Sequence, residues 1–428
     1  MKGRKSRRMV GVLRARLPEL QFRRVADPRR RASTSWKMGE ILSSATVGIV
    51  AGCRSLRDLE ALTDEMSTAS RTGLHMPRRL PDTTARDALV RVEPDDLRQS
   101  MYRQVRAAHR RKALKPVGLP FGVVSLDGKF VSIAGTQSRF ATVRSQGVDK
   151  PFGMVGTINS CLISSAPKVC LDAHSIGTGQ GEATVYTDAL VDLLDAYGSL
   201  NLFKLVVYDA GACSRVNARN TLDLGLDYLF RVKQGSQRKL YDASVGLLGS
   251  RTLEQADGFC EERVSGGLER RSIYLEQASV VWQRWTKQRS IVRQLHEILD
   301  EQGCVVQSDD RYYVTSLATD ALSPKQWIQV ARGHWAVENN CHHTWDAVLR
   351  EDDRPWIDAD AQGAMVIMLL RRIAYNILTL LREVTRRPAD RRGPAWRDLC
   401  RWFYNALIAA TVAQLVGLRK RRPATEEV

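Results

Sequence analysis

The chain has 428 residues, enough for two to four domains or for one catalytic domain with large additions. Hydrophobic residues make up 43% and charged residues 26%, a composition that argues against disordered, collagen-like and coiled-coil proteins. The longest apolar stretch, 364–370, is far shorter than the ~20 residues that span a bilayer, and no apolar segment follows the first charges. The eight cysteines include no C-x-x-C pair, which favours reduced thiols over disulfides or structural zinc. We therefore expect a cytoplasmic protein without a membrane anchor.

The net charge of +18 is concentrated at the two ends of the sequence. Residues 1–31 hold 12 Lys and Arg against two acids, and residues 371–428 hold 13 against five, so the middle is neutral. A nucleic acid that contacts both ends would be held by the release of counterions. The same charge could instead solubilise the protein or bind RNA and membranes non-specifically, and charge alone does not separate these interpretations.

A basic leader, 1–35, precedes a segment with helical patterning, 36–115. Asp82 and the Pro94 that follows Glu93 mark two helix starts, because these residue types are favoured at the first positions of helices. Residues 98–115 carry seven Lys and Arg and no acid, a face that could lie along DNA phosphates or be solvated. We expect a small helical domain that binds DNA.

After Pro116, strands alternate with helices, which favours an α/β sheet over a helical bundle. The predicted elements are a hairpin of 121–126 and 130–134, a strand pair over 150–171, a helix over 182–197, and strands over 203–208 and 226–232. Short β-like runs then follow, at 271–275, 280–285 and 312–317. We expect a core first part over 116–233, a β-rich insertion over 234–318 and a second part of the core over 319–358.

Ser323-Pro324-Lys325-Gln326 predicts a strong helix start, because Ser at the N-cap and Gln at the third position form a capping box. The helix should run through Glu338 to about Leu349, bent at Gly333. The last segment, 359–428, should contain two apolar-faced helices over 359–384 and 395–417.

Three acids stand out by their placement. Asp127 and Asp209 each follow a hydrophobic strand, and Glu338 lies in a helix dense in polar residues. Ligands bind off the carboxyl ends of strands in α/β proteins, and carboxylates without thiols suit Mg²⁺ or Mn²⁺. Such a site can hold two ions ~3.5–4 Å apart for displacement at phosphorus. Together with the basic ends, the acids indicate DNA strand chemistry.

Each of these residues also has a structural interpretation. Either Asp could be a turn residue or a helix cap, Glu338 could be a surface acid, and Lys129 could close the hairpin. The spacing of His334, Glu338 and His342 could also suggest zinc. The usual further ligands are missing from the sequence, and the neighbouring arginines suit an anion better.

The run 332–352, R-G-H-W-A-V-E-N-N-C-H-H-T-W-D-A-V-L-R-E-D, resembles the R-x-H-W-x-[IV]-E-N block that closes the active site of bacterial insertion-sequence transposases of the DDE type. Other blocks of that family are matched in the same order. They are Leu126–Lys129, Gly181–Glu182, Val206–Ala210, Asp227–Gln234 and Tyr312–Leu317, preceded by a similar helical leader over 39–92. The resemblance covers about 39–385.

This resemblance implies an RNase H-like mixed sheet flanked by helices and interrupted by a β-rich insertion, with helical N- and C-terminal parts. It implies that Asp127, Asp209 and Glu338 are catalytic and bind two Mg²⁺ or Mn²⁺ ions. The DNA-binding or supporting residues would be Lys129, Arg332, His334, Asn339, His342, Asp346 and Arg350.

The resemblance further implies a DNA transposase that cuts double-stranded DNA at the ends of its insertion sequence and joins them to target DNA. Two copies should pair two DNA ends, and the protein should be associated with the nucleoid. The broader group has Tyr, Arg and Lys where this chain has Ala331, His334 and Trp345. These departures leave open a catalytically inactive DNA-binding relic or repressor, and a metal-dependent nuclease without strand transfer is a further alternative.

Overall fold

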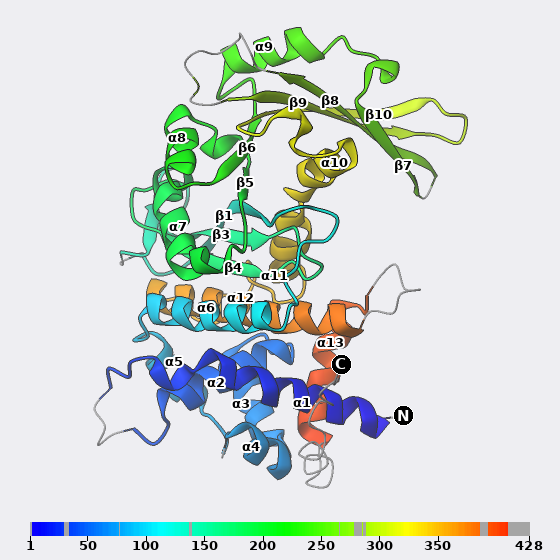
Figure 1. The fold of residues 1–428 in the computed structure, drawn as a ribbon. Helices are drawn as coiled ribbons and strands as arrows, with labels where there is room; N and C mark the ends of the chain where they lie inside the picture. The colour runs from blue at the N-terminus through cyan, green and yellow to red at the C-terminus, as the bar shows by residue number, and fades with distance from the viewer. Residues whose placement is uncertain are drawn as a thin grey trace.

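The computed structural model describes residues 2–29, 34–76, 78–136, 139–264, 266–277, 285, 288–385 and 393–409. Figure 1 shows a helical part at the bottom, a sheet-containing core in the middle and the β-rich insertion at the top. The long helices α6 (Pro94–Arg110) and α12 (Ala361–Thr385) lie side by side between the helical part and the core. The helical part therefore combines segments from both ends of the chain.

The basic leader forms a helix that packs into the helical part. This leader helix is α1 (Lys2–Leu20). The other helices of the helical part are η1 (Phe22–Arg24), α2 (Met38–Val50), α3 (Leu56–Glu65), α4 (Thr68–Leu74), α5 (Asp82–Leu89) and α13 (Trp396–Ala409). Val10, Leu13 and Leu20 of α1 are fully buried, and α1 contacts α13. Because apolar side chains recur on one face of the described part of α1, Arg8, Arg14 and Arg16 are less buried than Val10 and Leu13. The predicted helix over 395–417 continues past residue 409 outside the described residues.

The expectation that residues 98–115 carry a basic face for DNA phosphates stays a prediction, but some of their basic side chains are engaged within the protein. Arg98 is buried and ion-paired to Asp172 and Asp192. Arg106 donates to a backbone carbonyl, and Arg111 pairs with Glu19. Asp172, Asp192 and Glu19, which pair with Arg98 and Arg111, come from distant parts of the chain, so local composition gave no sign of them. Arg110, Lys112 and Lys115 are exposed.

The core is a mixed sheet with the strand order β4-β3-β1-β5-β6. Its strands are β1 (Val123–Ile133), β2 (Ala141–Arg144), β3 (Phe152–Leu162), β4 (Cys170–Ile176), β5 (Leu205–Tyr208) and β6 (Asp227–Val232). Strand β1 is antiparallel to β3 and parallel to β5, and β5 is parallel to β6. The short β2 pairs with the first residues of β3. This arrangement confirms the predicted RNase H-like α/β class.

The predicted hairpin at Asp127-Gly128-Lys129 is wrong, because β1 runs unbroken through these residues. Asp127 pairs with Asn159 of β3, and Gly128 pairs with Ile158. An Asp-Gly pair favours a turn locally, but pairing along the whole length of β3 overrides that preference. Asp127 therefore lies within a strand and projects from one face of the sheet.

The two faces of the sheet are covered by different helices. Val124, Leu126 and Tyr208 pack with α7 (Glu182–Tyr197), whereas Val123 and Val207 pack in the cluster that includes α10 and α12. Since side chains alternate along a strand, Asp127 and Asp209 project to the second face. The other helices near this region are η3 (Gly198–Leu200), η4 (Ala210–Ala212) and α8 (Arg215–Asp223).

The insertion extends the core sheet. It comprises α9 (Arg238–Leu248), η5 (Leu253–Gln255), β7 (Gly258–Val264), β8 (Gly267–Gln277), β9 (Ser290–Leu299), β10 (Val305–Thr315) and η6 (Thr319–Ala321). Strand β10 pairs with β6, so the described strands form one sheet of ten. Residues 280–284 of one predicted run lie outside the described residues.

The predicted long helix after Ser323 is interrupted. Ser323 N–H donates to Gln326 Oε1 over 2.9 Å, and α10 (Pro324–Gly333) ends at the predicted bend. The π-helical turn η7 (Val337–His342) and α11 (His343–Ala347) follow. Wider π-helical turns occur mostly at functional sites, and Glu338 lies in this one.

Helix α12 is long and apolar enough to cross a membrane by length and composition, but that stretch is entirely buried inside the protein. It also carries two fully buried arginines, Arg371 and Arg372. A core helix explains all of these properties, since buried charges are found paired within protein interiors.

Candidate active site

Two of the predicted acids come together through the register of the parallel strands. Leu126 of β1 is the partner of Tyr208 of β5, so Asp127 and Asp209 take the next position on adjacent strands. Their side chains point to the same face for the reason given above. The sheet thus brings together two carboxylates that are far apart in the sequence.

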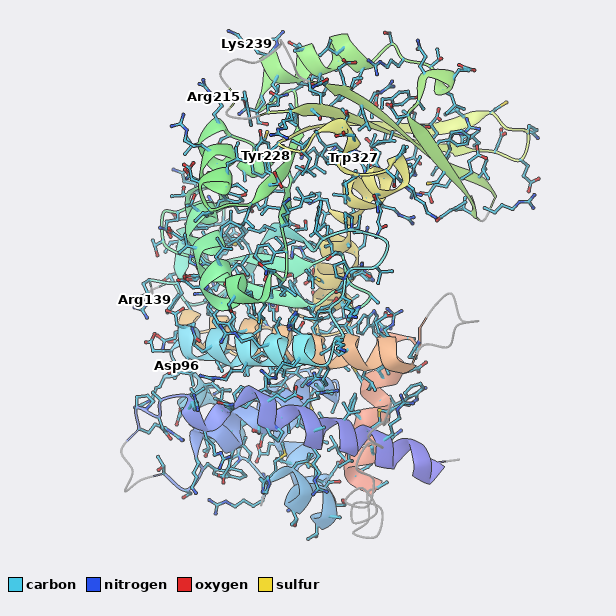
Figure 2. All side chains as sticks on the ribbon, viewed as in Figure 1. Asp96, Arg139, Arg215, Tyr228, Lys239 and Trp327 are labelled. Carbon is cyan, nitrogen blue, oxygen red and sulfur yellow. The ribbon has the colours of Figure 1, made fainter. Side chains whose placement is uncertain are left out.

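Glu338 approaches the same place from the helical layer. Helix α10 is anchored by the fully buried Trp327, which Figure 2 shows between the β-rich insertion and the core. The backbone then leads into η7, which contacts β1. The charge of Glu338 raises the pKa of Asp127, so the third predicted acid belongs to the same cluster.

The carboxylates carry more negative charge than their surroundings neutralise. Burial, together with the charges of Glu338, Glu182 and Asp209, raises the pKa of Asp127 to about 8. Burial and Asp209 also raise the pKa of Glu338. Carboxylates that share a site raise one another's pKa in this way.

Glu182, the first residue of α7, is a fourth carboxylate near Asp127, on the α7 face of β1. Tyr208 Oη donates to Glu182 Oε2 over 2.9 Å, and a Cβ at Gly128 would overlap the Glu182 carboxylate. Glycine is therefore needed beside Asp127 to let Glu182 approach. The matching Gly-Glu block was the signal in the sequence, but nothing in it placed Glu182 against Gly128.

Basic residues of β6 and β10 surround Asp209, and sequence reasoning missed their role. Lys233 Nζ donates to Asp209 Oδ2 over 2.8 Å, and Arg231 Nη1 lies 3.6 Å from Oδ1. Although burial opposes it, these cations and the backbone lower the pKa of Asp209. Arg311 lies 4.4 Å over the Trp335 ring and also acts on the charge of Glu338. The acid cluster is thus flanked by three cations.

Two of the three histidines of the block, His334 and His342, lie within the site and have lowered pKa values. His342 Nδ1 lies 3.4 Å from Asp127 Oδ2, and burial with the nearby cations lowers the pKa of His342 to about 3. His334 Nδ1 lies 2.9 Å from Ser125 Oγ, and burial lowers its pKa to about 4. Both rings contact β1 from residues 332–352, which we call the catalytic segment after the family block that they resemble.

Lys129 and Asp346 pair with each other inside the protein. Lys129 Nζ donates to Asp346 Oδ2 over 2.9 Å and to Asp352 Oδ1 over 2.7 Å, and its side chain is 9% exposed. This pair ties α11 to β1 and leaves Lys129 little surface for a phosphate.

The Glu351 of the same block is fully buried and pairs with Arg372 of α12. The Arg372 guanidinium stacks over the Trp345 ring, 3.9 Å from its centroid. Trp345 occupies a position where the broader group has Lys, so here the cation comes from α12. This contact attaches the catalytic segment to α12.

The remaining predicted residues lie at the surface. Arg332 is half exposed and lies 3.4 Å from Glu262 of β7, which links the catalytic segment to the insertion. Asn339 is exposed next to Glu338. Arg350 pairs with Asp353 over 2.6 Å.

The donor set at Asp127, Asp209 and Glu338 fits a hard divalent cation. All three offer carboxylate oxygens, and Asp209 Oδ1 is buried without a hydrogen bond from the described residues. Their ligand atoms are not gathered as tightly as those of another group: within the described ranges, only Asp172, His174 and Asp192 bring three candidate atoms within 4.8 Å of one another.

That second group is occupied by a side chain of the protein itself. Arg98 Nε donates to Asp172 Oδ1 over 2.9 Å, and Arg98 Nη2 contacts Asp172, Asp192 and His174. The guanidinium fills the place that a metal ion would take, so this group is an ion-pair cluster that joins α6 to the core. The zinc alternative at His334, Glu338 and His342 likewise finds no close group within the described part of the chain.

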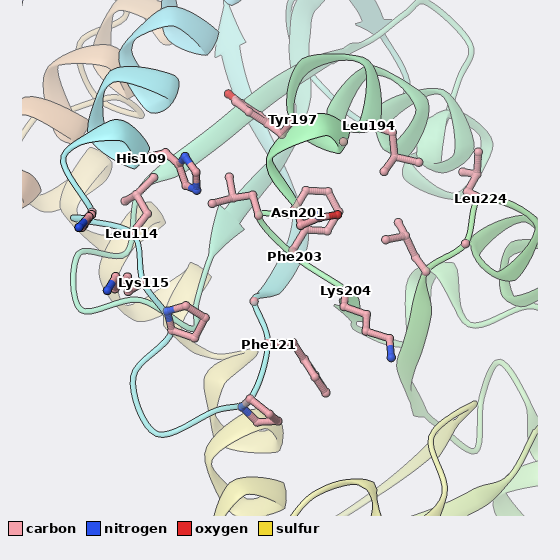
Figure 3. A pocket seen from close by; sticks show the side chains of 18 residues that line it. His109, Leu114, Lys115, Phe121, Leu194, Tyr197, Asn201, Phe203, Lys204 and Leu224 are labelled. Atoms are coloured by element: carbon pink, nitrogen blue, oxygen red, sulfur yellow. The ribbon is translucent and has the colours of Figure 1, made fainter.

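A hollow of about 720 Å³ lies at the opposite edge of the sheet. It is lined by residues that precede β1 and β5, among them Phe121, Phe203 and Lys204 (Figure 3). Because Asp127 and Asp209 follow the parallel-paired parts of these strands, the hollow is separate from the acid cluster.

This chain is similar to several known proteins. "H repeat-associated putative transposase YhhI" and "Putative protein YbfL", both of Escherichia coli (strain K12), are each 24% identical over 367 residues, which cover 83% of this chain and 88% of the relative. The solved piggyBac transposase synaptic complex with hairpin DNA aligns at 13% identity with a TM-score of 0.40, over 98% of this chain and 80% of that chain. Residues 121–377, from β1 into α12, match the model of the transposase DDE domain. The chain therefore belongs to the transposase DDE domain family.

Proposed function

We propose that this protein is a DNA transposase that cleaves DNA at the ends of its insertion sequence and joins those ends to target DNA. The observation that carries the proposal is the convergence of Asp127 and Asp209, which follow the partners Leu126 and Tyr208, with Glu338 of the catalytic segment. Membership of the transposase DDE domain family supports it.

Asp127, Asp209 and Glu338 would hold Mg²⁺ or Mn²⁺, as two ions. When bound, such ions stabilise the charge on the attacking and leaving oxygens of an in-line displacement at phosphorus. Hard oxygen donors and an excess of negative charge at the cluster support this assignment.

The protein's own side chains orient the reactants. His342 holds Asp127 through its Nδ1, while Lys233, Arg231 and Arg311 offer charge to the phosphates beside the cleaved bond. Water attacks phosphorus, the P–O3′ bond breaks, and the 3′ oxygen leaves as a hydroxyl after taking up a proton. In joining, that 3′-OH loses its proton and attacks a target phosphorus, whose P–O3′ bond breaks.

The partner is double-stranded DNA, both element ends and target. The net charge of +18 supports binding to a polyanion, and two copies of the chain would pair two ends. A protein with this role acts in the cytoplasm on the nucleoid.

A cleavage assay tests the proposal. Labelled duplex DNA that carries the sequence flanking this gene is incubated with Mg²⁺ or Mn²⁺ and with wild type, Asp127→Asn, Asp209→Asn or Glu338→Gln. The amide variants keep the side-chain shape, so we expect intact DNA binding without cleavage. Asp188→Asn, an exposed change on α7, is the control and should cleave like wild type.

The alternatives give different products. Wild type that binds the ends and never cuts with either metal would identify a DNA-binding relic and overturn the proposal. Cleaved ends without joined products would identify a nuclease without strand transfer.

A further inference from the structure

A small hollow lies where the helical part meets the end of the catalytic segment. Its volume is about 250 Å³, and four arginines line it. Arg54 follows α2, Arg350 follows α11, and Arg397 and Arg401 lie on α13. Three segments that are distant in the sequence thus converge with guanidinium groups at one place.

Acidic side chains only partly neutralise these arginines. Arg350 pairs with Asp353 over 2.6 Å, and Arg401 pairs with Asp398 over 2.7 Å. Arg54 and Arg397 have no ion pair within the described residues, and no carboxylate lines the hollow there. Like charges repel when gathered in this way, so an anion would stabilise the arrangement.

Arg350 gives two independent signs of a binding role. Its Nε is buried and has no hydrogen-bond partner among the described residues, which leaves a donor that an anion's oxygen would satisfy. Its backbone has a φ of 57°, in the left-handed region that costs energy for a residue other than glycine. Such strained residues cluster at ligand sites.

The volume of the hollow and its distance from Glu338 limit which ligands it could bind. At ~30 Å³ for each water molecule, the hollow has room for a phosphate group with some water, and it is smaller than the ~300–1,000 Å³ typical of drug-sized ligands. Arg350 follows Glu338 by 12 residues, and the mostly helical path between them corresponds to ~18 Å, or ~5 base pairs of DNA.

We propose that this arginine hollow binds one backbone phosphate of the DNA, within about five base pairs of the cleaved bond. The proposal rests on the proposed function, because it takes the ligand to be the DNA that the acid cluster cuts. Guanidinium forks match phosphate oxygens in geometry as well as in charge. The hollow would fix the register of the DNA on the protein and carry no sequence preference.

The test is DNA binding as a function of salt concentration, in the full chain and without divalent metal. Arg397→Ala/Arg401→Ala removes two exposed side chains of α13, and Arg54→Ala is a second, independent variant. We expect about tenfold weaker binding for the double variant and a salt slope reduced by about 1.

Arg215→Ala/Arg219→Ala is the matched control, because it removes the same charge from the exposed surface of α8; Figure 2 shows Arg215 on the far side from α13. Equal affinity and slope for the two double variants would overturn the proposal. Ethylation of single phosphates identifies which phosphate the hollow contacts. Ethylation of one phosphate within about five base pairs of the cut should weaken DNA binding by wild type, and not by the Arg397→Ala/Arg401→Ala variant.

Failure of the proposed function itself looks different. In that case wild type would not cut the DNA with either metal, whatever the arginine variants do to binding.

Discussion

Replacing Lys233 with glutamine removes a cation from one oxygen of Asp209. Lys233 Nζ donates to Asp209 Oδ2 over 2.8 Å, so in the DNA-free protein this ion pair occupies an atom that a metal ion needs. The Lys233 ammonium repels a divalent ion at Asp209, and its hydrogen bond competes with the ion for Oδ2. Glutamine keeps the length of the side chain without its charge.

The exposure of the pair sets the size of the effect. The Lys233 and Asp209 side chains are 47% and 31% exposed, so solvent screens their attraction. Ion pairs of this kind contribute about 0.2–1 kcal/mol, which corresponds to about 1.5- to 5-fold in a dissociation constant. We therefore expect Lys233→Gln to bind Mn²⁺ up to about fivefold more tightly than wild type in the absence of DNA.

Mn²⁺ binding is measured by electron paramagnetic resonance, in which free Mn²⁺ gives the signal. Lys239→Gln on α9 is the control, because it removes an exposed charge that has no ion pair within the described residues. Unchanged or weaker Mn²⁺ binding in Lys233→Gln would refute the reasoning. Once released from Asp209, Lys233 is free for DNA, so the same variant should also bind DNA with a salt slope lower by about 1.

Three further predictions concern the groups around the site. Arg98→Ala should lower the free energy of unfolding by roughly 3–5 kcal/mol, since it leaves the buried Asp172 unpaired; urea unfolding measures this, and a loss below 1 kcal/mol would contradict it. The hydrogen bond with His174, against burial, lowers the pKa of Asp192 to about 2, so its stabilisation is present above pH 4 and lost as pH falls toward 2; Asp192→Asn should lack that loss in acid unfolding curves. Gly128→Ala should push away the Glu182 carboxylate and weaken Mn²⁺ binding by about fivefold. Unchanged Mn²⁺ binding would argue against a role for Glu182 at the acid cluster.

Local signals predicted much of the secondary structure. The helix expected over 182–197 is observed as Glu182–Tyr197, and the helix expected after Ser323 begins at Pro324. The start of the second helix is fixed by a local contact, the Ser323–Gln326 capping contact. Patterns that involve residues a few positions apart can be recognised from the sequence alone.

Contacts between distant segments were not predictable. Asp127-Gly128-Lys129 has the composition of a turn, yet β3 keeps it in a strand. The glycine serves a close approach by Glu182, and the lysine is neutralised by Asp346. Each partner comes from a part of the chain that local reasoning treats separately.

The expectation that the three acids lie together stays a prediction, and nothing in the sequence indicated the cations around them. The cations of Lys233, Arg231 and Arg311 come from β6 and β10, and the insertion that carries β10 separates them in the sequence. Only the antiparallel pairing of β10 with β6 brings them together.

Anomalous X-ray scattering from crystals soaked in Mn²⁺ tests the central claim most directly. The account predicts a peak in contact with Asp127 and Asp209, lost in Asp127→Asn. A peak only at Asp172, His174 and Asp192, or no peak at the acid cluster at millimolar Mn²⁺, would contradict it.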